Sequence, residues 1–461
     1  MKIILLGAGQ VGSSLAYSLV KEGNDITLID TDHEVLEEIS DKADLRVLCG
    51  NGAHPDILEQ AGAEQADMIV ALTKSDEVNM IACQVAHTLF KTPTKIARVR
   101  TPQYLTHNNL FITESLAIDV VISPEILISQ HIEQLIDNPG ALQVLNFTTD
   151  SIQLIAMRVR EGYSIIGKNL QSFVDSQKDK KISIPALFRG DKAILPDNKT
   201  SVEIGDEIFF LSEKENVSSI ANSLRGKEKP NTNIIIVGGG NIGAHLASSL
   251  EKKYETKIID RNQERSKALA GVLENTTVLT GDASDEDLLL QENIESMDVF
   301  CALTSEDEAN IVSSMLAKRL GTRRVITLVT KPSYEDIIKD GEIDITVSPQ
   351  QITISSVLSH IRQGDVVSVH ALRGGNAEAL EVIVHGDKKQ SDIVGKKIEK
   401  IKLPSGCTLC LIIRKDEIIL PSDEDVIESE DHIILFVTQK KSVPAVEKLF
   451  QVKATYMYSN I

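Results

Sequence analysis

Two glycine-rich segments have the residue types and the spacing of loops that bind phosphate. Each contains the pattern GxGxxG, as GAGQVG and GGGNIG, and the glycines are Gly7, Gly9, Gly12, Gly238, Gly240 and Gly243. In such a loop the first glycine allows a tight turn, the second lets the backbone approach a pyrophosphate, and the third lets a helix pack closely against a strand. The phosphates lie on unpaired N–H groups at the positive end of the helix dipole. The two segments therefore predict two sites for a phosphorylated ligand.

An aspartate follows each loop at the distance expected for a residue that binds a ribose. Asp30 ends the segment DITLID, which follows Gly7, and Asp260 ends TKIID, which follows Gly238. Both spacings are close to the separation of roughly 20 residues that is typical of a dinucleotide-binding unit. A carboxylate at this place accepts hydrogen bonds from the ribose hydroxyls and repels a 2′-phosphate. The two aspartates therefore predict NAD or a plain adenine nucleotide rather than NADP.

Both loops belong to a repeat that extends well beyond the glycines. The segment GAEQADMIVALTKSDEVNMIACQVA at 62–86 returns at 293–317 as NIESMDVFCALTSEDEANIVSSMLA. At this same offset, three polar residues have identical counterparts: Thr73, Asp76 and Asn79 recur as Thr304, Asp307 and Asn310. A constant offset of this kind indicates a tandem duplication. The chain is thus predicted to contain two copies of one nucleotide-binding unit.

The two copies differ where the fifth strand of each sheet is expected to end. In the first copy, ARVRTPQY places Arg98 and Arg100 near the carboxyl edge of the sheet, where ligands bind. An arginine at this edge can neutralise a phosphate through a forked contact. When the two copies are aligned on the following proline, Leu328 and Thr330 of the second copy occupy the positions of the two arginines. The second site is therefore predicted to bind more weakly, or to bind a ligand with fewer charges.

Strands that alternate with helices are expected to position these motifs. Apolar strands are predicted at KIILLG, DITLID, LRVLCG, MIVALT and KIARVR, and QVGSSLAYSLVKE has helical spacing. This alternation predicts a parallel, doubly wound sheet that is covered on both faces. The segment 142–224 has shorter strands and more turns, and its IIGKNL motif returns as IVGKKI in the second half. It therefore predicts a smaller unit that is also duplicated.

The predicted fold class is α/β, with two tandem Rossmann-like parallel-sheet domains, each followed by a small α+β domain. The predicted boundaries are 1–123 and 232–349 for the Rossmann-like domains, and 140–224 and 366–453 for the small domains. The charged, proline-containing segment RGKEKPNTN at 225–233 is predicted to link the two halves. IRQGD at 361–365 takes a similar place within the second half.

Composition argues against several classes of partner. The formal net charge of −19, the absence of tryptophan and an aromatic content of 4% disfavour a nucleic-acid partner, which needs clustered cations and aromatic surfaces. No stretch approaches the ~20 consecutive apolar residues of a membrane helix. The opening MKIILLGAG is expected to form a first strand rather than a signal peptide. We therefore expect a cytoplasmic protein that binds no nucleic acid.

The five cysteines predict neither a disulfide framework nor a metal site. Cys407 and Cys410 form a lone CxxC in GCTLCLIIRK, a segment that alternates like a strand. Alternation would place the two side chains on opposite faces of the sheet. A structural zinc site would also need a second pair of ligands. We therefore expect no bound metal.

The alternative function is that of an NAD-dependent oxidoreductase with a duplicated Rossmann domain. A dehydrogenase needs a proton-relay residue, usually a histidine, beside the nicotinamide. His54 and His87 are the nearest candidates in the first half, but their repeat counterparts are Asp285 and Lys318. We therefore expect no catalytic residue and no enzyme activity. A transcription factor is disfavoured because the sequence contains no visible basic helix-turn-helix segment.

The motifs KIILLGAGQVG, DITLID, LRVLCGNGAHP, ALTKSDEVNM and ARVRTPQY, in a duplicated chain, resemble the TrkA family. This family comprises the cytosolic regulatory subunits of bacterial Trk potassium uptake systems. The resemblance covers essentially the whole chain and implies two RCK units that bind NAD(H), with ATP or ADP as alternatives. It also implies a homo-oligomer, a dimer or a tetramer ring, that gates an integral membrane potassium channel subunit of the Trk type. The protein would then be peripheral on the cytoplasmic face of the inner membrane.

The motifs and the resemblance together give the candidate cofactor-binding residues. In the first half these are Gly7, Ala8, Gly9, Gln10, Val11, Gly12, Asp30, Asn51, Thr73, Lys74, Arg98 and Arg100. In the second half they are Gly238, Gly239, Gly240, Asn241, Ile242, Gly243, Asp260, Arg261, Asp282, Thr304 and Ser305. Asn51 and its counterpart Asp282 follow the third strand of their copies, in GNGAH and GDASD.

Overall fold

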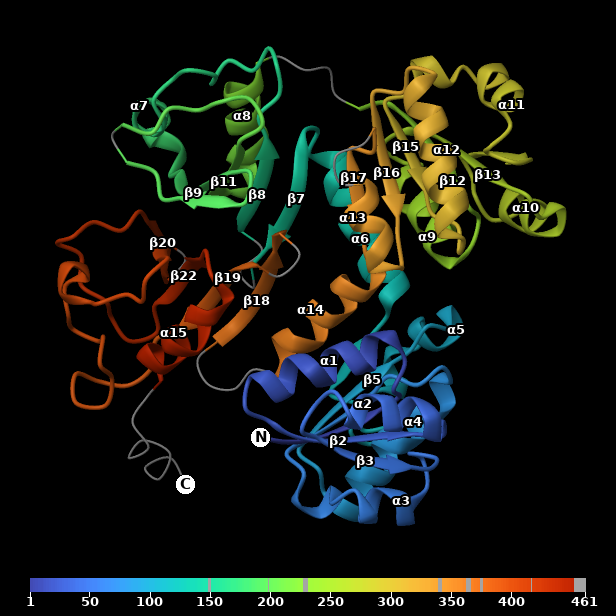
Figure 1. The fold of residues 1–461 in the computed structure, drawn as a ribbon, viewed down its shortest axis with the longest axis vertical. Coiled ribbons are helices and arrows are strands. Elements are labelled where there is room, and N and C mark those ends of the chain that lie inside the picture. Colours follow the sequence, from blue (N-terminus) through green and yellow to red (C-terminus); the bar gives the residue numbers. More distant parts are fainter. Residues whose placement is uncertain are drawn as a thin grey trace.

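The structure is a computed structural model of the chain. It describes residues 1–147, 151–197, 199–226, 231–338, 342–361, 366–373, 376–415 and 417–451. In this part of the chain two parallel sheets lie on one side of the molecule and two antiparallel sheets on the other (Figure 1). The predicted linkers at 225–233 and 361–365 lie partly outside the described residues.

The first parallel sheet has the strand order β3-β2-β1-β4-β5-β6. Its strands are β1 (Lys2–Leu6), β2 (Asp25–Asp30), β3 (Arg46–Cys49), β4 (Met68–Ala71), β5 (Thr94–Arg98) and β6 (Val120–Ile122). Its helices are α1 (Gln10–Lys21), α2 (His33–Ser40), α3 (Pro55–Gln60), α4 (Asp76–Val85) and α5 (Pro102–Leu105). The strand order reverses between β1 and β4, so the carboxyl ends of these strands form the crevice where a doubly wound sheet binds its ligand.

The second parallel sheet repeats this order as β14-β13-β12-β15-β16-β17. Its strands are β12 (Asn233–Val237), β13 (Glu255–Asp260), β14 (Thr277–Thr280), β15 (Val299–Ala302), β16 (Arg324–Leu328) and β17 (Ile345–Val347). Its helices are α9 (Asn241–Leu250), α10 (Gln263–Ala270), α11 (Glu286–Gln291), α12 (Asp307–Arg319) and α13 (Pro332–Ile338). The predicted α/β class and the duplication are confirmed.

Each half also contains an antiparallel sheet, with orders β10-β9-β11-β8-β7 and β18-β19-β22-β20-β21. The first comprises β7 (Ala141–Asn146), β8 (Ile152–Arg158), β9 (Ser183–Arg189), β10 (Lys192–Ile194) and β11 (Glu207–Glu213), with α7 (Leu170–Ser176) and α8 (Lys214–Arg225). The second comprises β18 (Val366–Leu372), β19 (Ala377–Ile383), β20 (Cys407–Arg414), β21 (Glu417–Ile419) and β22 (His432–Val437), with α15 (Val443–Phe450).

The two antiparallel sheets pack against each other. Phe209 and Phe436 meet at the centre of this interface, with ring centroids 5.3 Å apart. Cys410 belongs to the same apolar cluster, whereas Cys407 belongs to the cluster on the other face of its sheet. The expectation that these two cysteines lie on opposite faces of a strand is confirmed, and they cannot share a ligand.

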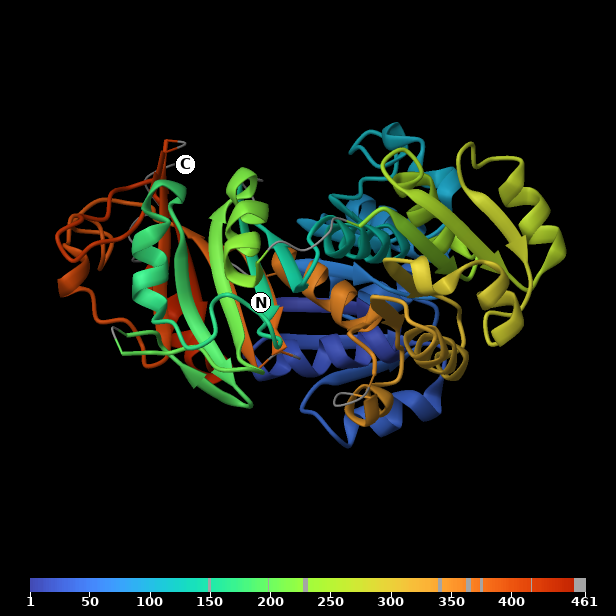
Figure 2. The same ribbon diagram turned by 90° about the horizontal axis from the view of Figure 1, so that it is seen from above.

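Two long helices cross between the halves. Helix α6 (Pro124–Asp137) follows the first parallel sheet but packs against α9 of the second, and α14 (Pro349–Ile361) follows the second sheet but packs against α1 of the first. Ile128 and Ile132 share a core with the second sheet, and Val357 and Leu358 share one with the first. Figures 1 and 2 show α6 and α14 between the two parallel sheets. The halves thus exchange one helix each.

We propose that the chain divides at the boundaries 1–123, 140–224, 232–349 and 366–453. Each of these segments contains the strands of one sheet and of no other. Helices α6 and α14 lie between these segments, and each buries apolar side chains such as Ile132 and Val357.

Candidate nucleotide-binding site

Both glycine loops begin with a residue in the left-handed region. The φ angles of Gly7 and Gly238 are +101° and +102°, which only glycine adopts without strain. The N–H group of each donates to the carbonyl at the end of the neighbouring strand, Ile29 or Ile259, at 2.8 Å. The first glycine of each loop therefore makes the tight turn that the sequence predicts.

The second and third glycines of each loop have different surroundings. A Cβ atom placed on Gly9 or Gly240 would meet no atom within 4 Å, so this part of the backbone faces open space. A Cβ atom placed on Gly12 or Gly243 would lie 1.9 Å from the carbonyl oxygen of the first glycine. The second glycine can therefore contact a pyrophosphate, whereas Gly12 and Gly243 act through helix packing rather than through direct contact with a ligand.

The two aspartates lie beside the loops, as their spacing predicts. Asp30 Oδ2 accepts from the N–H group of Ala8 at 2.6 Å, and Asp260 Oδ2 accepts from that of Gly239 at the same distance. Burial raises the pKa of Asp260, but hydrogen bonds from the N–H groups of Asn262 and Gly239 and from the Arg265 side chain lower it overall. Each carboxylate thus holds its loop and keeps further lone pairs for a ribose.

An asparagine that the sequence analysis did not single out as a site residue fixes each threonine turn. Asn79 Oδ1 accepts from the Thr73 N–H at 2.9 Å and from its hydroxyl at 2.7 Å. Asn310 holds Thr304 in the same way, at 2.9 and 2.6 Å. Both asparagines are fully buried, so they position the turn. Their recurrence at the repeat offset was the available signal.

Other predicted residues lie around the loops in different environments. Asn51 Oδ1 accepts from the Ala53 N–H at 3.0 Å, which closes a local turn. Asp282 accepts from the hydroxyl and the N–H of Ser284, and these bonds lower its pKa. Arg261 Nε lies 3.5 Å from Asp282 Oδ2, and Arg261 Nη2 lies 3.6 Å from Glu306 Oε2. Lys74 and Ser305 are exposed.

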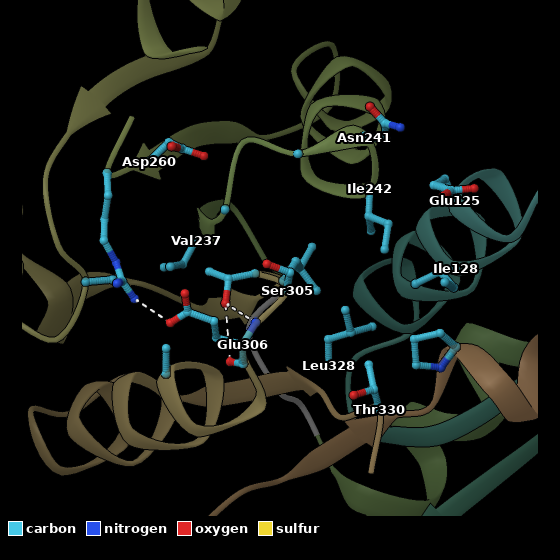
Figure 3. Close-up of a pocket in the computed structure, with 18 of the residues that line it drawn as sticks. Glu125, Ile128, Val237, Asn241, Ile242, Asp260, Ser305, Glu306, Leu328 and Thr330 are labelled. Carbon is cyan, nitrogen blue, oxygen red and sulfur yellow. Dashed lines mark hydrogen bonds and ion pairs between the residues drawn. The ribbon is translucent and has the colours of Figure 1, made fainter. Parts of the chain in front are cut away.

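A cavity of about 690 Å³ lies at the second loop and is lined by residues of both halves. The second half contributes the loop from Gly240 to Ile242 together with Asp260, Arg261, Asp282, Thr304 and Ser305. The first half contributes Gln10 and Val11 of its own loop and the side chains of Arg98, Arg100 and Glu125. In Figure 3, Glu125 and Ile128 on α6 lie beside Asn241 and Ile242 on α9, and the two helices pack against each other. Gly9, Asp30 and Thr73 of the first half do not line it, so the cavity belongs mainly to the second loop and reaches the first turn of α1.

The arginines require a correction to the comparison of the two sites. Leu328 and Thr330 do occupy the positions of the two arginines on the second sheet. The Thr330 hydroxyl donates to the carboxylate of Asp307. However, Arg98 and Arg100 line the same cavity as the second loop. The second loop therefore has cations nearby, although its own fifth strand supplies none.

Arg98 and Arg100 are held in different ways. Arg98 Nη2 donates to the Thr73 carbonyl at 2.6 Å, and its buried Nε has no hydrogen-bond partner among the described residues. Burial, followed by the charge of Arg100, lowers the pKa of Arg98. Arg100 Nε donates to Glu125 Oε1 at 2.6 Å. An anion in the cavity would be stabilised by both guanidinium groups.

The histidines considered for an oxidoreductase lie away from this cavity. His54 is exposed and precedes helix α3, and His87 is half-buried after α4. Neither is among the residues that line the cavity.

Known protein families match the chain along most of its length. The TrkA-N domain model matches residues 3–124 and again 234–349, and the TrkA-C domain model matches residues 388–451. The Trk system potassium uptake protein TrkA of Halomonas elongata is 49% identical over 456 residues, which cover 99% of this chain and 100% of that protein. The TrkA protein of Vibrio alginolyticus is 47% identical over 452 residues, 98% of this chain and 99% of that protein.

The chain belongs to the TrkA family. Solved structures support the fold of this TrkA family member. The GsuK RCK domain covers 97% of this chain and 94% of its own, with a TM-score of 0.61 and 19% identity. The GsuK channel bound to NAD covers 96% of this chain and 79% of its own, also with a TM-score of 0.61 and 19% identity. Among the described residues, no helix is both long enough and apolar enough to span a membrane.

Replacing Asp30 by alanine should weaken binding of NADH or ADP at the first site by about ten- to a hundredfold. The ribose loses a charged acceptor worth roughly 1.5–3 kcal/mol, and the Ala8 N–H loses its partner. Calorimetric titration of the full chain measures the change. Asp30→Asn, which keeps an oxygen for Ala8 but loses the charge, separates the two causes. Unchanged affinity in folded Asp30→Ala protein would remove Asp30 from the site.

Proposed function

We propose that the protein is a cytosolic regulatory subunit that binds NAD(H), ATP or ADP and gates a membrane potassium channel of the Trk type. The observation that carries this proposal is the cavity at the second phosphate loop, which Arg98 and Arg100 of the first half also line. Membership of the TrkA family supplies the biological context, because the named relatives are potassium uptake proteins.

Several residues support a nucleotide as the ligand. Gly9 and Gly240 leave room for a pyrophosphate at the N-termini of α1 and α9. Asp30 and Asp260 favour an unmodified ribose, as in NAD(H), and a fold neighbour has been solved bound to NAD. Arg98 and Arg100 add positive charge that suits the additional phosphate of ATP. One pocket can thus accept competing adenine nucleotides.

The proposed mechanism uses the exchanged helices. A nucleotide shifts the protein between conformations only by its different affinity for each of them. Helices α6 and α14 each line the cavity at their N-terminal ends and lead directly towards β7 and β18 of the antiparallel sheets. A ligand that changes the separation of the loops would therefore tilt these helices and reorient the small domains. The channel would respond to that reorientation.

Exposed apolar side chains support a homo-oligomer, which we propose is a dimer or a tetramer ring. Ile81 on α4 is 47% exposed, and its repeat counterpart Val312 on α12 is 56% exposed. Leu89 and Met315, close to these positions, are 58% and 42% exposed. Apolar groups exposed together on equivalent elements are typical of protein–protein interfaces. The same face of each half is thus suited to contact another copy of the chain.

The proposed role is not catalytic, and the protein would lie on the cytoplasmic face of the inner membrane through its channel partner. The residues lining the cavity offer hydrogen bonds and charge to a nucleotide, and the candidate relay histidines lie elsewhere. Steady, substrate-dependent turnover of NADH by the purified protein would contradict this assignment.

Deletion of the gene should strongly reduce potassium uptake when external potassium is limiting. The reason is that the proposed channel loses the nucleotide-binding subunit that activates it. Uptake of potassium or rubidium in the deletion strain measures the effect, and the wild-type gene on a plasmid should restore it. A plasmid carrying Gly9→Val should restore less, because the protein is made but its first site is blocked. Normal uptake in a deletion strain with no second regulator would contradict the proposal.

A further inference from the structure

A glutamine from the second half contacts the phosphate loop of the first half. Gln350, the second residue of α14, donates from Nε2 to the carbonyl oxygen of Gln10 at 3.1 Å and to Ser14 Oγ at 2.6 Å. Gln10 is the first residue of α1 and directly follows Gly9. The backbone of Gly9, the residue before Gln10, faces open space, so this contact lies beside the place where the phosphates of the first site would bind.

The contact acts on the peptide group that presents the loop to a ligand. The carbonyl of Gln10 and the N–H of Val11 belong to one planar peptide unit and point in opposite directions. Gln350 donates to this carbonyl, as does Ser13 Oγ at 3.3 Å, and together they help to fix the direction of the N–H, which lies in the first turn of α1. N–H groups in the first turn have no partner within the helix and are the groups that bind phosphate. Gln350 is thus placed to orient a phosphate donor without touching the phosphate.

The other half has no equivalent of this contact among the described residues. Pro124-Glu125 corresponds to Pro349-Gln350 at the start of the exchanged helix. A carboxylate cannot donate to a carbonyl, and Glu125 instead accepts from Arg100. The counterpart of Ser14 is His245, and its Nδ1 lies 2.8 Å from Ser129 Oγ. The helix that follows the second loop therefore contacts the exchanged helix through a histidine and a serine, not through a glutamine.

We propose that Gln350 is a positioning residue for the first nucleotide site and that it selects for ligands that carry a diphosphate. The first site is then complete only when α14 of the second half is in place. Conversely, a diphosphate bound to the first loop stabilises the position of α14, which leads to β18. This inference rests on the proposed function of the loops as nucleotide sites.

Calorimetry on the full chain tests the proposal with ADP and adenosine as probes. Gln350→Ala should weaken ADP binding at the first site about five- to tenfold, because the loop N–H groups lose their fixed direction. Adenosine, which has no phosphate to meet the loop, should bind as it does to the wild type. Gln350→Glu should weaken ADP binding at least as much, since a carboxylate would face the Gln10 carbonyl. Gln351→Ala, an exposed neighbour of the same residue type, is the matched control and should bind ADP normally.

A double-mutant cycle tests the specific contact. Ser14→Ala removes one of the two acceptors, so Gln350→Ala should weaken ADP binding less in that background than in the wild type. An equal loss of ADP and adenosine affinity in Gln350→Ala would overturn the proposal and leave a structural role only. Wild-type ADP affinity in folded Gln350→Ala protein would overturn it as well. Failure of the wild-type first loop to bind ADP would instead refute the proposed function of that loop.

Discussion

Replacing Gly240 by valine is expected to lower nucleotide affinity at the second loop by at least about a hundredfold, or ~2.7 kcal/mol. The φ and ψ angles of Gly240 are −69° and −173°, an extended conformation that valine adopts readily. Because its Cβ would enter open space, the fold should persist and the melting temperature should stay near that of the wild type. The branched side chain would occupy the space in which a pyrophosphate must approach the backbone.

Titration of the full chain with NADH or ADP measures this result as a loss of one of two sites. Gly9→Val is the matched variant, because a Cβ at Gly9 also meets no atom within 4 Å. It should remove the first site and keep the second. If the wild type binds one nucleotide per chain and Gly9→Val alone removes it, the second loop is a structural element that binds no ligand.

Replacing Gly243 by alanine, unlike replacing Gly240 by valine, should destabilise the protein. The new Cβ would lie 1.9 Å from the carbonyl oxygen of Gly238, so the loop or the helix must move. Alanine favours a helix over glycine by about 1 kcal/mol, but such a collision in a packed region costs about 1–3 kcal/mol or more. The steric cost exceeds the gain in helix propensity, because the atom that must move belongs to the backbone. Because the backbone must shift, we take the upper part of that range, about 2–3 kcal/mol. Subtracting the helix gain of about 1 kcal/mol leaves an expected fall of about 1–2 kcal/mol in the free energy of unfolding, and the second site should weaken.

Chemical or thermal unfolding of the full chain measures this loss. Gly12→Ala should behave alike in the first half, where the same 1.9 Å contact would form. Gly271→Ala is the control, because its Cβ would meet its nearest neighbour at an ordinary 3.4 Å. An unchanged unfolding midpoint in Gly243→Ala would show that the loop relaxes without cost.

The sequence predicted local features of the site better than its arrangement in space. The roles of the three glycines follow from spacing, and Asp30 and Asp260 lie against their loops as expected. The strand β6 was not predicted, because Val120–Ile122 is too short to show a pattern. Asn79 and Asn310 were noted only as part of the repeat, since a polar helical residue gives no sign that it is buried.

The shared cavity could not be predicted from periodicity. The apolar face of α6 is visible in the sequence, but a pattern of apolar residues does not say which sheet the face will cover. The exchange of α6 and α14 brings Arg98 and Arg100 to the second loop. The prediction of a second site without arginines compared aligned positions within each copy, and it could not include residues that arrive from the other copy.

The exchange of helices also sets what a single repeat could do by itself. A half with no partner would leave the apolar face of its crossing helix in water, and a second identical half could cover it by the reciprocal exchange. Two identical halves related by a twofold axis would have identical sites, because every substitution would appear in both. Covalent joining removes that restriction, so one position can be glutamine in one half and glutamate in the other. The pairs Gln350 and Glu125, and Arg98 and Leu328, are differences that a symmetric pair of separate chains could not hold.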